Sequence, residues 1–166
     1  MSNTGKNQFS GRLRQVRAKD LDEIAGMDQD CFGPELAWPK EDLAFYLTKP
    51  QSLSTIFSMA ALPATKDKPQ IIAGYGLASI EEGTTGTIIS IAVREAFRGR
   101  GLGLRMLKHL CGNLPRKGAT DIELQVEETN LTAIRLYKNF GFAVTGTLPD
   151  YYAPGRHGLQ MALMKP

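Results

Sequence analysis

A glycine-rich turn between two apolar segments is the feature that most constrains how this chain can fold. Residues 87–93, "TIISIAV", predict a buried strand, and residues 104–111, "LRMLKHLC", predict an amphipathic helix. Between them, residues 97–103, "FRGRGLG", hold three glycines and two arginines. The first N–H groups of a helix have no internal partner and lie at the positive end of its dipole. A strand, a bare turn and a helix in this order therefore predict an anion site.

The spacing of the glycines separates three phosphate-binding schemes. A dinucleotide fingerprint built on Gly99 and Gly101 needs a further glycine at position 104, where this chain has leucine. A P-loop needs Gly-Lys followed by Ser or Thr, and the sequence contains no such triplet. The third scheme is Arg/Gln-x-x-Gly-x-Gly/Ala after a strand, and residues 98–103, "RGRGLG", satisfy it.

Length and composition predict one domain. A chain of 166 residues with 42% hydrophobic content can build a single well-buried core. The longest apolar stretch, residues 56–64, is far shorter than the ~20 residues that a membrane-spanning helix needs. Residues 1–10 are polar and predict a disordered leader, which leaves residues 11–166 for the domain and favours a cytoplasmic location.

Charge is distributed unevenly along the chain. Residues 94–117 carry seven basic residues and one acid, whereas residues 20–42 carry eight acids and one lysine. The basic segment lacks the interleaved aromatics of a nucleic-acid stacking platform, so no nucleic-acid partner is expected. The acidic segment predicts a solvated helix face or, alternatively, a surface that attracts a cationic substrate. Cys31 and Cys111 have no His or Cys at ligand spacing and predict two free, mostly buried thiols and no metal site.

Hydrophobic periodicity predicts an alternation of strands and helices. Asp20 and Asn130 are the expected helix caps. The expected helices cover residues 21–32, 38–50, a segment from 104 whose core side carries Leu104, Leu107, Cys111 and Leu114, and 131–140, with an apolar face of Ala133, Leu136, Tyr137 and Phe140. The expected strands begin near residue 11 and then cover residues 53–62, 70–82, 87–93, 120–128, 142–148 and 158–166. A turn at residues 63–69 and a loop at 149–157 join neighbouring strands.

Two sequence blocks together carry a resemblance to a known family. The first is "SIAVREAFRGRGLGLRMLKHL", and the second is "LQVEETNLTAIRLYKNFGF", with the pattern Asn-x-x-Ala-x-x-x-Tyr-x-x-x-Gly-Phe. In this order and spacing they resemble the GCN5-related N-acetyltransferase (GNAT) family. The ending "DYYAPGRHGLQMALMKP" is most similar to the RimI/Ard1-type protein N-terminal acetyltransferases within it. The resemblance implies an α/β (α+β) fold with a single mixed, mostly antiparallel central sheet of six to seven strands, flanked by about four helices.

The resemblance also implies where acetyl-coenzyme A would bind. The amides of residues 99–104 would hold the pyrophosphate, and the neighbouring arginines would attract the polyanion. The strand at residues 91–93 would hydrogen-bond the pantetheine arm as an added strand does. The implied cofactor-binding residues are Ile91, Ala92, Val93, Arg98, Gly99, Arg100, Gly101, Leu102, Gly103, Leu104, Asn130 and Tyr137.

Tyr137 is the implied proton donor to the coenzyme A thiolate, although its pattern alone is typical of a core aromatic. Gln125 stands where RimI-like enzymes place a glutamate base, and an amide cannot accept a proton near neutral pH. An α-amine has a reference pKa of ~7.7–8.0, against ~10.4 for lysine, so a missing base favours an α-amine acceptor. Glu123 and Glu127 share the strand face of Gln125 and could act through water. The substrate-side candidates are Glu35, Asp150, Tyr151 and Tyr152.

The sequence therefore predicts an acetyl-CoA-dependent N-acetyltransferase that transfers acetyl to a primary amine directly, in a ternary complex. The favoured acceptor is a protein N-terminal α-amine, such as that of a ribosomal protein, and the expected state is a monomer or homodimer. A small-molecule amine acceptor (polyamine, amino acid or antibiotic), a non-catalytic acyl-CoA sensor and a nucleotide-binding protein are the alternatives. Neither cysteine occupies a recognised catalytic position, which argues against a covalent acetyl-enzyme.

Overall fold

The computed structural model describes residues 11–50, 52–60, 70–80 and 83–164. The predicted leader and the predicted turn at residues 63–69 lie outside this part of the chain. Seven strands form one sheet in the order β1-β2-β3-β4-β5-β7-β6, and every neighbouring pair except β4–β5 is antiparallel. The strands are β1 (Gly11–Gln15), β2 (Ser52–Ala60), β3 (Gln70–Ile80), β4 (Thr85–Val93), β5 (Asp121–Glu127), β6 (Phe142–Ala153) and β7 (Arg156–Leu163).

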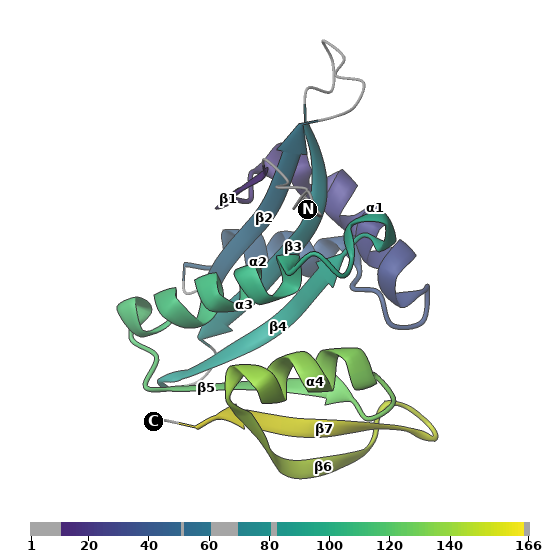
Figure 1. Cartoon of the computed structure of the whole chain (residues 1–166), viewed down its shortest axis with the longest axis vertical. Helices are drawn as coiled ribbons and strands as arrows, with labels where there is room; N and C mark the ends of the chain where they lie inside the picture. The colour runs from purple at the N-terminus through teal and green to yellow at the C-terminus, as the bar shows by residue number, and fades with distance from the viewer. Residues whose placement is uncertain (1–10, 51, 61–69, 81–82, 165–166) are drawn as a thin grey trace, which may run out of the picture.

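Four α-helices of the described residues cover the two faces of this sheet (Figure 1). They are α1 (Leu21–Phe32), α2 (Lys40–Thr48), α3 (Leu102–Asn113) and α4 (Leu131–Phe140). Helices α1 and α2 pack on one face, and α3 and α4 pack on the other. The predicted mixed, mostly antiparallel sheet with flanking helices is thus confirmed. In the described part of the chain, no helix has the length and apolar character needed to cross a membrane.

Each face of the sheet has its own core. The larger core lies under α3 and α4, and the smaller one, under α1 and α2, contains Tyr75 of β3. The predicted core side of α3 was partly wrong: Met106 and Leu110 are fully buried, whereas Leu104 is half-buried and faces a cavity. On α4 the prediction likewise missed the buried Ile134.

The parallel pair β4–β5 holds together over only part of its length. It runs from Thr85 opposite Asp121 to Ile88 opposite Leu124, and beyond this point the described strands diverge (Figure 1). Next to the divergence, a register shift in β3–β4 leaves Ile89 without a β3 partner, which is a β-bulge. The bulge interrupts the alternation of side chains along β4, so residues after it face the helices on both sides of the sheet. The divergence of β4 and β5 and the bulge in β4 together leave an opening within the sheet.

The closing hairpin differs from the prediction. The segment expected as a loop at residues 149–157 continues β6 to Ala153 and starts β7 at Arg156. A register shift between Leu148 and Ala153 absorbs the extra residues of β6. Within it, Asp150 has a left-handed φ of 53°, and its carboxylate accepts a hydrogen bond from the Gly155 amide at 2.7 Å. This side-chain bond replaces the missing ladder pairs and keeps the hairpin extended.

The acidic segment is not uniformly solvated. Asp20 occupies the N-cap position of α1, as predicted, but its side chain makes no cap hydrogen bond. Its carboxylate instead pairs with the Arg14 guanidinium at 2.7 and 2.9 Å and accepts the Arg17 amide at 2.7 Å. Asp28 is completely buried within the core between α1 and the sheet. The other predicted cap, Asn130, is confirmed, since its side chain accepts the Ala133 amide at 3.1 Å.

Candidate active site

The turn before α3 is shaped by its glycines. Gly99 and Gly101 have φ of 72° and 76°, and a side chain in this left-handed region is strained. The first hydrogen bond of α3 runs from the Arg105 amide to the Gly101 carbonyl at 3.0 Å. The amides of residues 102–104 precede it, so they have no acceptor within the helix and point at the turn. The predicted order of strand, glycine turn and helix is thus observed, and anion binding at this turn stays a prediction.

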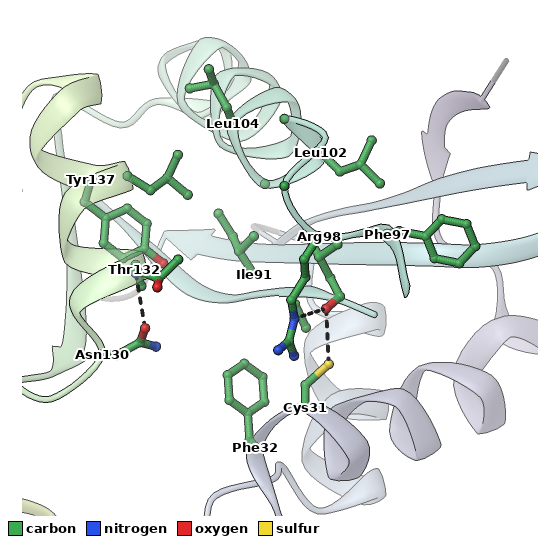
Figure 2. A pocket seen from close by; sticks show the side chains of 17 residues that line it. Cys31, Phe32, Ile91, Phe97, Arg98, Leu102, Leu104, Asn130, Thr132 and Tyr137 are labelled. Atoms are coloured by element: carbon green, nitrogen blue, oxygen red, sulfur yellow. Dashed lines mark hydrogen bonds between the residues drawn. The ribbon is translucent and has the colours of Figure 1, made fainter. Parts of the chain in front are cut away.

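A cavity of ≈ 520 Å³ lies in front of this turn, between the end of β4, the start of α3 and the start of α4 (Figure 2). Eleven of the twelve predicted cofactor-binding residues line it: Ile91, Ala92, Val93, Arg98, Gly99, Gly101, Leu102, Gly103, Leu104, Asn130 and Tyr137. Arg100 does not, because the turn between two left-handed glycines directs its side chain over the Phe97 ring, 5.7 Å from the ring centroid. We call this space the donor cavity.

Six residues of the donor cavity were not expected from the sequence. Thr132, Ala133 and Leu136 belong to α4, where the last two had been assigned to the core. The others are Phe97, Cys31 and Phe32, and the last two come from the end of α1. The Val93 carbonyl brings α1 and the turn together: it accepts from Cys31 Sγ at 3.6 Å and from Arg98 Nε at 3.0 Å (Figure 2). Burial raises the pKa of Cys31, which keeps this thiol protonated.

Tyr137 directs its hydroxyl into the donor cavity (Figure 2). Its side chain is 8% exposed, and its ring makes an edge contact with Phe142, with centroids 5.9 Å apart. Burial, with a smaller effect from Cys111, raises the pKa of Tyr137 to about 12. Within the described part of the chain the hydroxyl has no hydrogen-bond partner, so its proton is available to a group in the cavity.

A second cavity of ≈ 660 Å³ lies beside the first, and we call it the acceptor cavity. Its walls come from the α1–α2 connection, α2, the first parts of β4 and β5, and the β6–β7 hairpin. Four candidates line it: Glu35, Gln125, Tyr151 and Tyr152, as does the neighbouring Glu123. Asp150 lies outside it, since its carboxylate closes the hairpin turn. Tyr151 and Tyr152 form an edge-to-face pair with centroids 5.0 Å apart.

A small cavity of ≈ 130 Å³ lies between the two larger ones and shares walls with both. It shares Asn130 and Tyr137 with the donor cavity and Gln125 and Tyr152 with the acceptor cavity. We call it the junction. Burial raises the pKa of Tyr152 far above its usual range, so both tyrosines of the junction carry their protons at neutral pH. Next to the point where β4 and β5 stop pairing, Tyr137 thus lines both the donor cavity and the junction.

The glutamate and glutamine side chains of β5 provide no free base at the junction. Gln125 donates from Nε2 to the Gln160 Oε1 atom at 2.9 Å. Glu127 accepts two hydrogen bonds from Arg156, at 2.7 and 3.0 Å, and these hold its pKa below the usual range. A carboxylate with a lowered pKa is a weaker proton acceptor near neutral pH. Glu123 lines the acceptor cavity but not the junction.

The comparisons with known proteins agree with this geometry. The family model described as "Acetyltransferase (GNAT) family" matches residues 21–142. An N-alpha-acetyltransferase of Sulfolobus acidocaldarius is 27% identical over 169 residues, which cover 95% of this chain and 94% of the relative. The [ribosomal protein bS18]-alanine N-acetyltransferase of Salmonella typhimurium is 36% identical over 78 residues, 47% of this chain and 52% of the relative.

Among solved structures, Ard1 from Thermoplasma volcanium superposes with a TM-score of 0.77 at 23% identity, covering 93% of this chain and 99% of that one. These relatives confirm the resemblance to the RimI/Ard1-type enzymes. The family model spans the strand, the glycine turn and the α4 block that build the donor cavity and the junction. The chain therefore belongs to the acetyltransferase (GNAT) family.

Proposed function

We propose that this acetyltransferase transfers acetyl from acetyl-coenzyme A to the α-amine of a protein N-terminus. The observation that carries the proposal is the junction, where a cavity at a helix N-terminus meets a second, aromatic cavity beside the Tyr137 hydroxyl. The names of the Sulfolobus and Salmonella relatives, an N-alpha-acetyltransferase and a ribosomal-protein alanine N-acetyltransferase, support this acceptor class.

The residues of the donor cavity fit acetyl-coenzyme A. The free first-turn amides of α3 suit a pyrophosphate, and the bare Gly99 and Gly101 leave open space through which it can approach the backbone. Residues 91–93 lie beyond the last β4–β5 pair, so their backbone edge can receive an extended pantetheine arm. Arg98 adds positive charge at the mouth of the cavity. The bound cofactor supplies an activated acetyl thioester.

At the junction, Tyr137 is the proton donor that the proposal requires. Its burial keeps the proton in place over the neutral pH range, and its hydroxyl has no competing partner within the described residues. In the proposed reaction it donates this proton to the departing sulfur and recovers one from the attacking nitrogen. Asn130 holds the start of α4, and therefore the position of the Tyr137 turn, through its cap.

The acceptor cavity suits an extended peptide end better than a compact amine. At ≈ 660 Å³ it has room for several residues, and Trp38, Tyr46, Tyr151 and Tyr152 give it aromatic walls. The α-amine would stand at the smaller junction, beside the Tyr137 side chain. An α-amine is partly neutral at physiological pH, which lowers the demand on a base compared with lysine.

The test is coenzyme A release by the purified protein with acetyl-CoA and short peptides that differ in their N-terminal residue. The same peptides with a blocked N-terminus are the matched controls, and polyamines and free amino acids are run in parallel. We expect turnover of free-N-terminus peptides that the blocking group abolishes. Turnover of polyamines or amino acids alone contradicts the acceptor class, and cofactor binding without any turnover contradicts catalysis.

A further inference from the structure

Three polar side chains form a buried hydrogen-bonded chain beside the junction. Asp28 of α1 is 0% exposed, Tyr75 of β3 is 2% exposed and Ser90 of β4 is 8% exposed. One oxygen of Asp28 accepts a short hydrogen bond from the Tyr75 hydroxyl, and the other accepts the Trp38 amide at 2.6 Å. The Tyr75 hydroxyl and Ser90 Oγ are 2.9 Å apart. These hydrogen bonds thus link α1 to β3 and β3 to β4.

The hydrogen positions in this chain follow from the donors available. Tyr75 has a single hydroxyl proton, and it is donated to Asp28. The bond between Tyr75 and Ser90 must therefore be donated by Ser90, which leaves the lone pairs of Ser90 Oγ free to accept from another group. Ser90 lines the junction together with Gln125 and Tyr137. Ser90, at the outer end of these hydrogen bonds, is thus a hydrogen-bond acceptor at the place where the substrate amine would stand.

Asp28, at the inner end of these hydrogen bonds, is a carboxylate without a cationic partner among the described residues. The groups that face it are Tyr75 of β3, Ser90 through Tyr75, the Cys31 thiol of α1 and the Trp38 amide. Helix α2 contributes apolar and aromatic side chains to this core, and Arg94 pairs instead with Glu23 at 3.3 Å. Burying an unpaired carboxylate is costly, and its burial raises the pKa of Asp28. Such groups are often functional.

We propose that Ser90, Tyr75 and Asp28 form a proton relay that serves as the base for the acceptor amine, in place of a carboxylate at position 125. The proposal rests on the acyl-transfer function assigned above. Ser90 is the group that touches the amine, and Tyr75 and Asp28 act through it. The bulge at Ile89 supports this role, because it turns Ser90 toward α1 while the neighbouring Ile91 packs on the α3 side.

The proton count of the relay balances. The N–H bond of the ammonium breaks as Ser90 accepts the proton, Ser90 passes its own proton to Tyr75, and Tyr75 passes its proton to Asp28. Asp28 ends as a neutral carboxylic acid, and the amine becomes a neutral nucleophile. The second N–H proton, lost when the amide forms, replaces the one that Tyr137 gives to sulfur. After product release the same path returns the Asp28 proton to solvent through the junction.

The test compares the pH dependence of kcat/KM in the wild type, Ser90→Ala and Tyr75→Phe. We expect both variants to lose about 10- to 100-fold near pH ~6.5, where the amine is mostly charged, and less than about 3-fold near pH ~9, where it is neutral without help. Acetyl-CoA affinity should stay unchanged. Ser79→Ala is the matched control, because Ser79 of β3 is a buried serine like Ser90 but lines none of the three cavities.

A loss that is equal at all pH values, or a wild-type profile in Ser90→Ala, overturns the relay and leaves Asp28 as a support for the Trp38 segment. Circular dichroism and thermal melts identify a variant that has failed to fold, and Ser90→Ala then decides alone because it leaves the Asp28–Tyr75 bond intact. If the protein acetylates another kind of amine, the proposed acceptor class is wrong. The same pH profiles, measured with that amine, then still test the relay.

If no amine is turned over, infrared difference spectra of the wild type against Asp28→Asn give a readout that does not need activity. The relay requires that Asp28 be ionised before it receives a proton from Tyr75. A protonated-carboxyl band of Asp28 that persists across the whole range from pH ~5 to ~9 overturns the proposal.

Discussion

At the scale of single residues, Tyr137 is defined by burial together with access to the junction. Tyr137→Phe removes only the hydroxyl and keeps the edge contact with Phe142. We expect kcat to fall by about 10²-fold or more, the usual contribution of a positioned acid, while the Kd for coenzyme A measured by calorimetry stays unchanged. Because the pKa of Tyr137 is raised to about 12, loss of its proton should not limit activity below pH ~11. An undiminished kcat would remove Tyr137 from the mechanism.

Gly74 and Gly112 allow a matched test of how an added methyl group changes the free energy of unfolding. A Cβ added to Gly74 of β3 would lie 2.8 Å from the Ala92 carbonyl oxygen and 3.0 Å from Met106 Cε. Gly74→Ala should therefore lower the free energy of unfolding by about 1–3 kcal/mol through overpacking. Gly112→Ala in α3 meets no atom within 4 Å and should raise it by about 0.4–1 kcal/mol. Urea denaturation measures both, and a neutral Gly74→Ala would contradict the close strand packing.

Asp28 shows where sequence reasoning stopped at this scale. It lies four residues after Ile24 and three before Cys31, so it shares the apolar stripe of α1. The surrounding acids nevertheless favoured a solvated face. Position in the stripe could have indicated burial, but the partner hydroxyl of Tyr75 lies 47 positions away in sequence. No local pattern predicts which distant side chain will satisfy a buried carboxylate.

At the scale of elements, the cap of α4 separates two roles of one side chain. Asn130→Ala loses the hydrogen bond to the Ala133 amide and should destabilise the protein by about 1 kcal/mol, measured by chemical denaturation. Asn130→Ser keeps a capping oxygen and should restore most of that stability. If Asn130 also contacts the cofactor arm, Asn130→Ser will still raise the KM for acetyl-CoA. Full recovery of both quantities would limit Asn130 to its structural role.

The Arg14–Asp20 pair fixes the edge strand β1 to the start of α1. Its hydrogen bonds lower the pKa of Asp20 below the unfolded value, so the stabilisation is present above that value and is lost as pH falls through the folded one. Asp20→Asn should cost about 1–3 kcal/mol at pH ~7, and the difference from wild type should shrink as the pH falls below the usual aspartate range. Asp22→Asn, at an exposed ion pair with Lys40, is the control and should leave the stability nearly unchanged. A pH-independent difference would contradict the charge argument.

Local signals predicted some elements well and others poorly. The helices at residues 21–32 and 131–140 were predicted with their observed bounds, because periodicity and flanking residues agree there. The β6–β7 hairpin was not, since the Pro and Gly residues near its end are typical of a loop. The continuation of β6 depends on the hydrogen bond between Asp150 and Gly155 and on pairing with β7, and local sequence patterns do not predict these interactions.

At the scale of the whole molecule, the donor cavity lies between β4 and α3 on one side and α4 on the other, next to the point where β4 and β5 stop pairing. A ligand that fills it contacts β4, α3 and α4 at once. Coenzyme A should therefore raise the melting temperature, with about 2.7 kcal/mol of added stability at 100 times its Kd. Adenosine 3′,5′-bisphosphate, which lacks the arm that enters the gap, should give a smaller shift in scanning fluorimetry. Equal shifts would place the arm outside the protein.

The two halves of the site differed in how far the sequence could predict them. The donor side is built mostly from residues 91–104 and 130–137, two continuous blocks whose motifs are local. The acceptor side combines Glu35 and Trp38 of the α1–α2 connection with Gln125 of β5 and Tyr152 of β6, which are three separated segments. Their meeting depends on the divergence of β4 and β5, which no single segment encodes. The sequence thus predicted most of the donor cavity and only individual residues of the acceptor cavity.

The separation of the two cavities has a consequence for redesign. The β6–β7 hairpin and the α1–α2 connection border the acceptor cavity, while the glycine turn and the start of α3 border only the donor cavity. Tyr151 is 52% exposed, so substitutions there alter the entrance without disturbing a core. If the proposed acceptor site is correct, grafting a different β6–β7 hairpin should change acceptor preference while the glycine turn and the start of α3 stay the same.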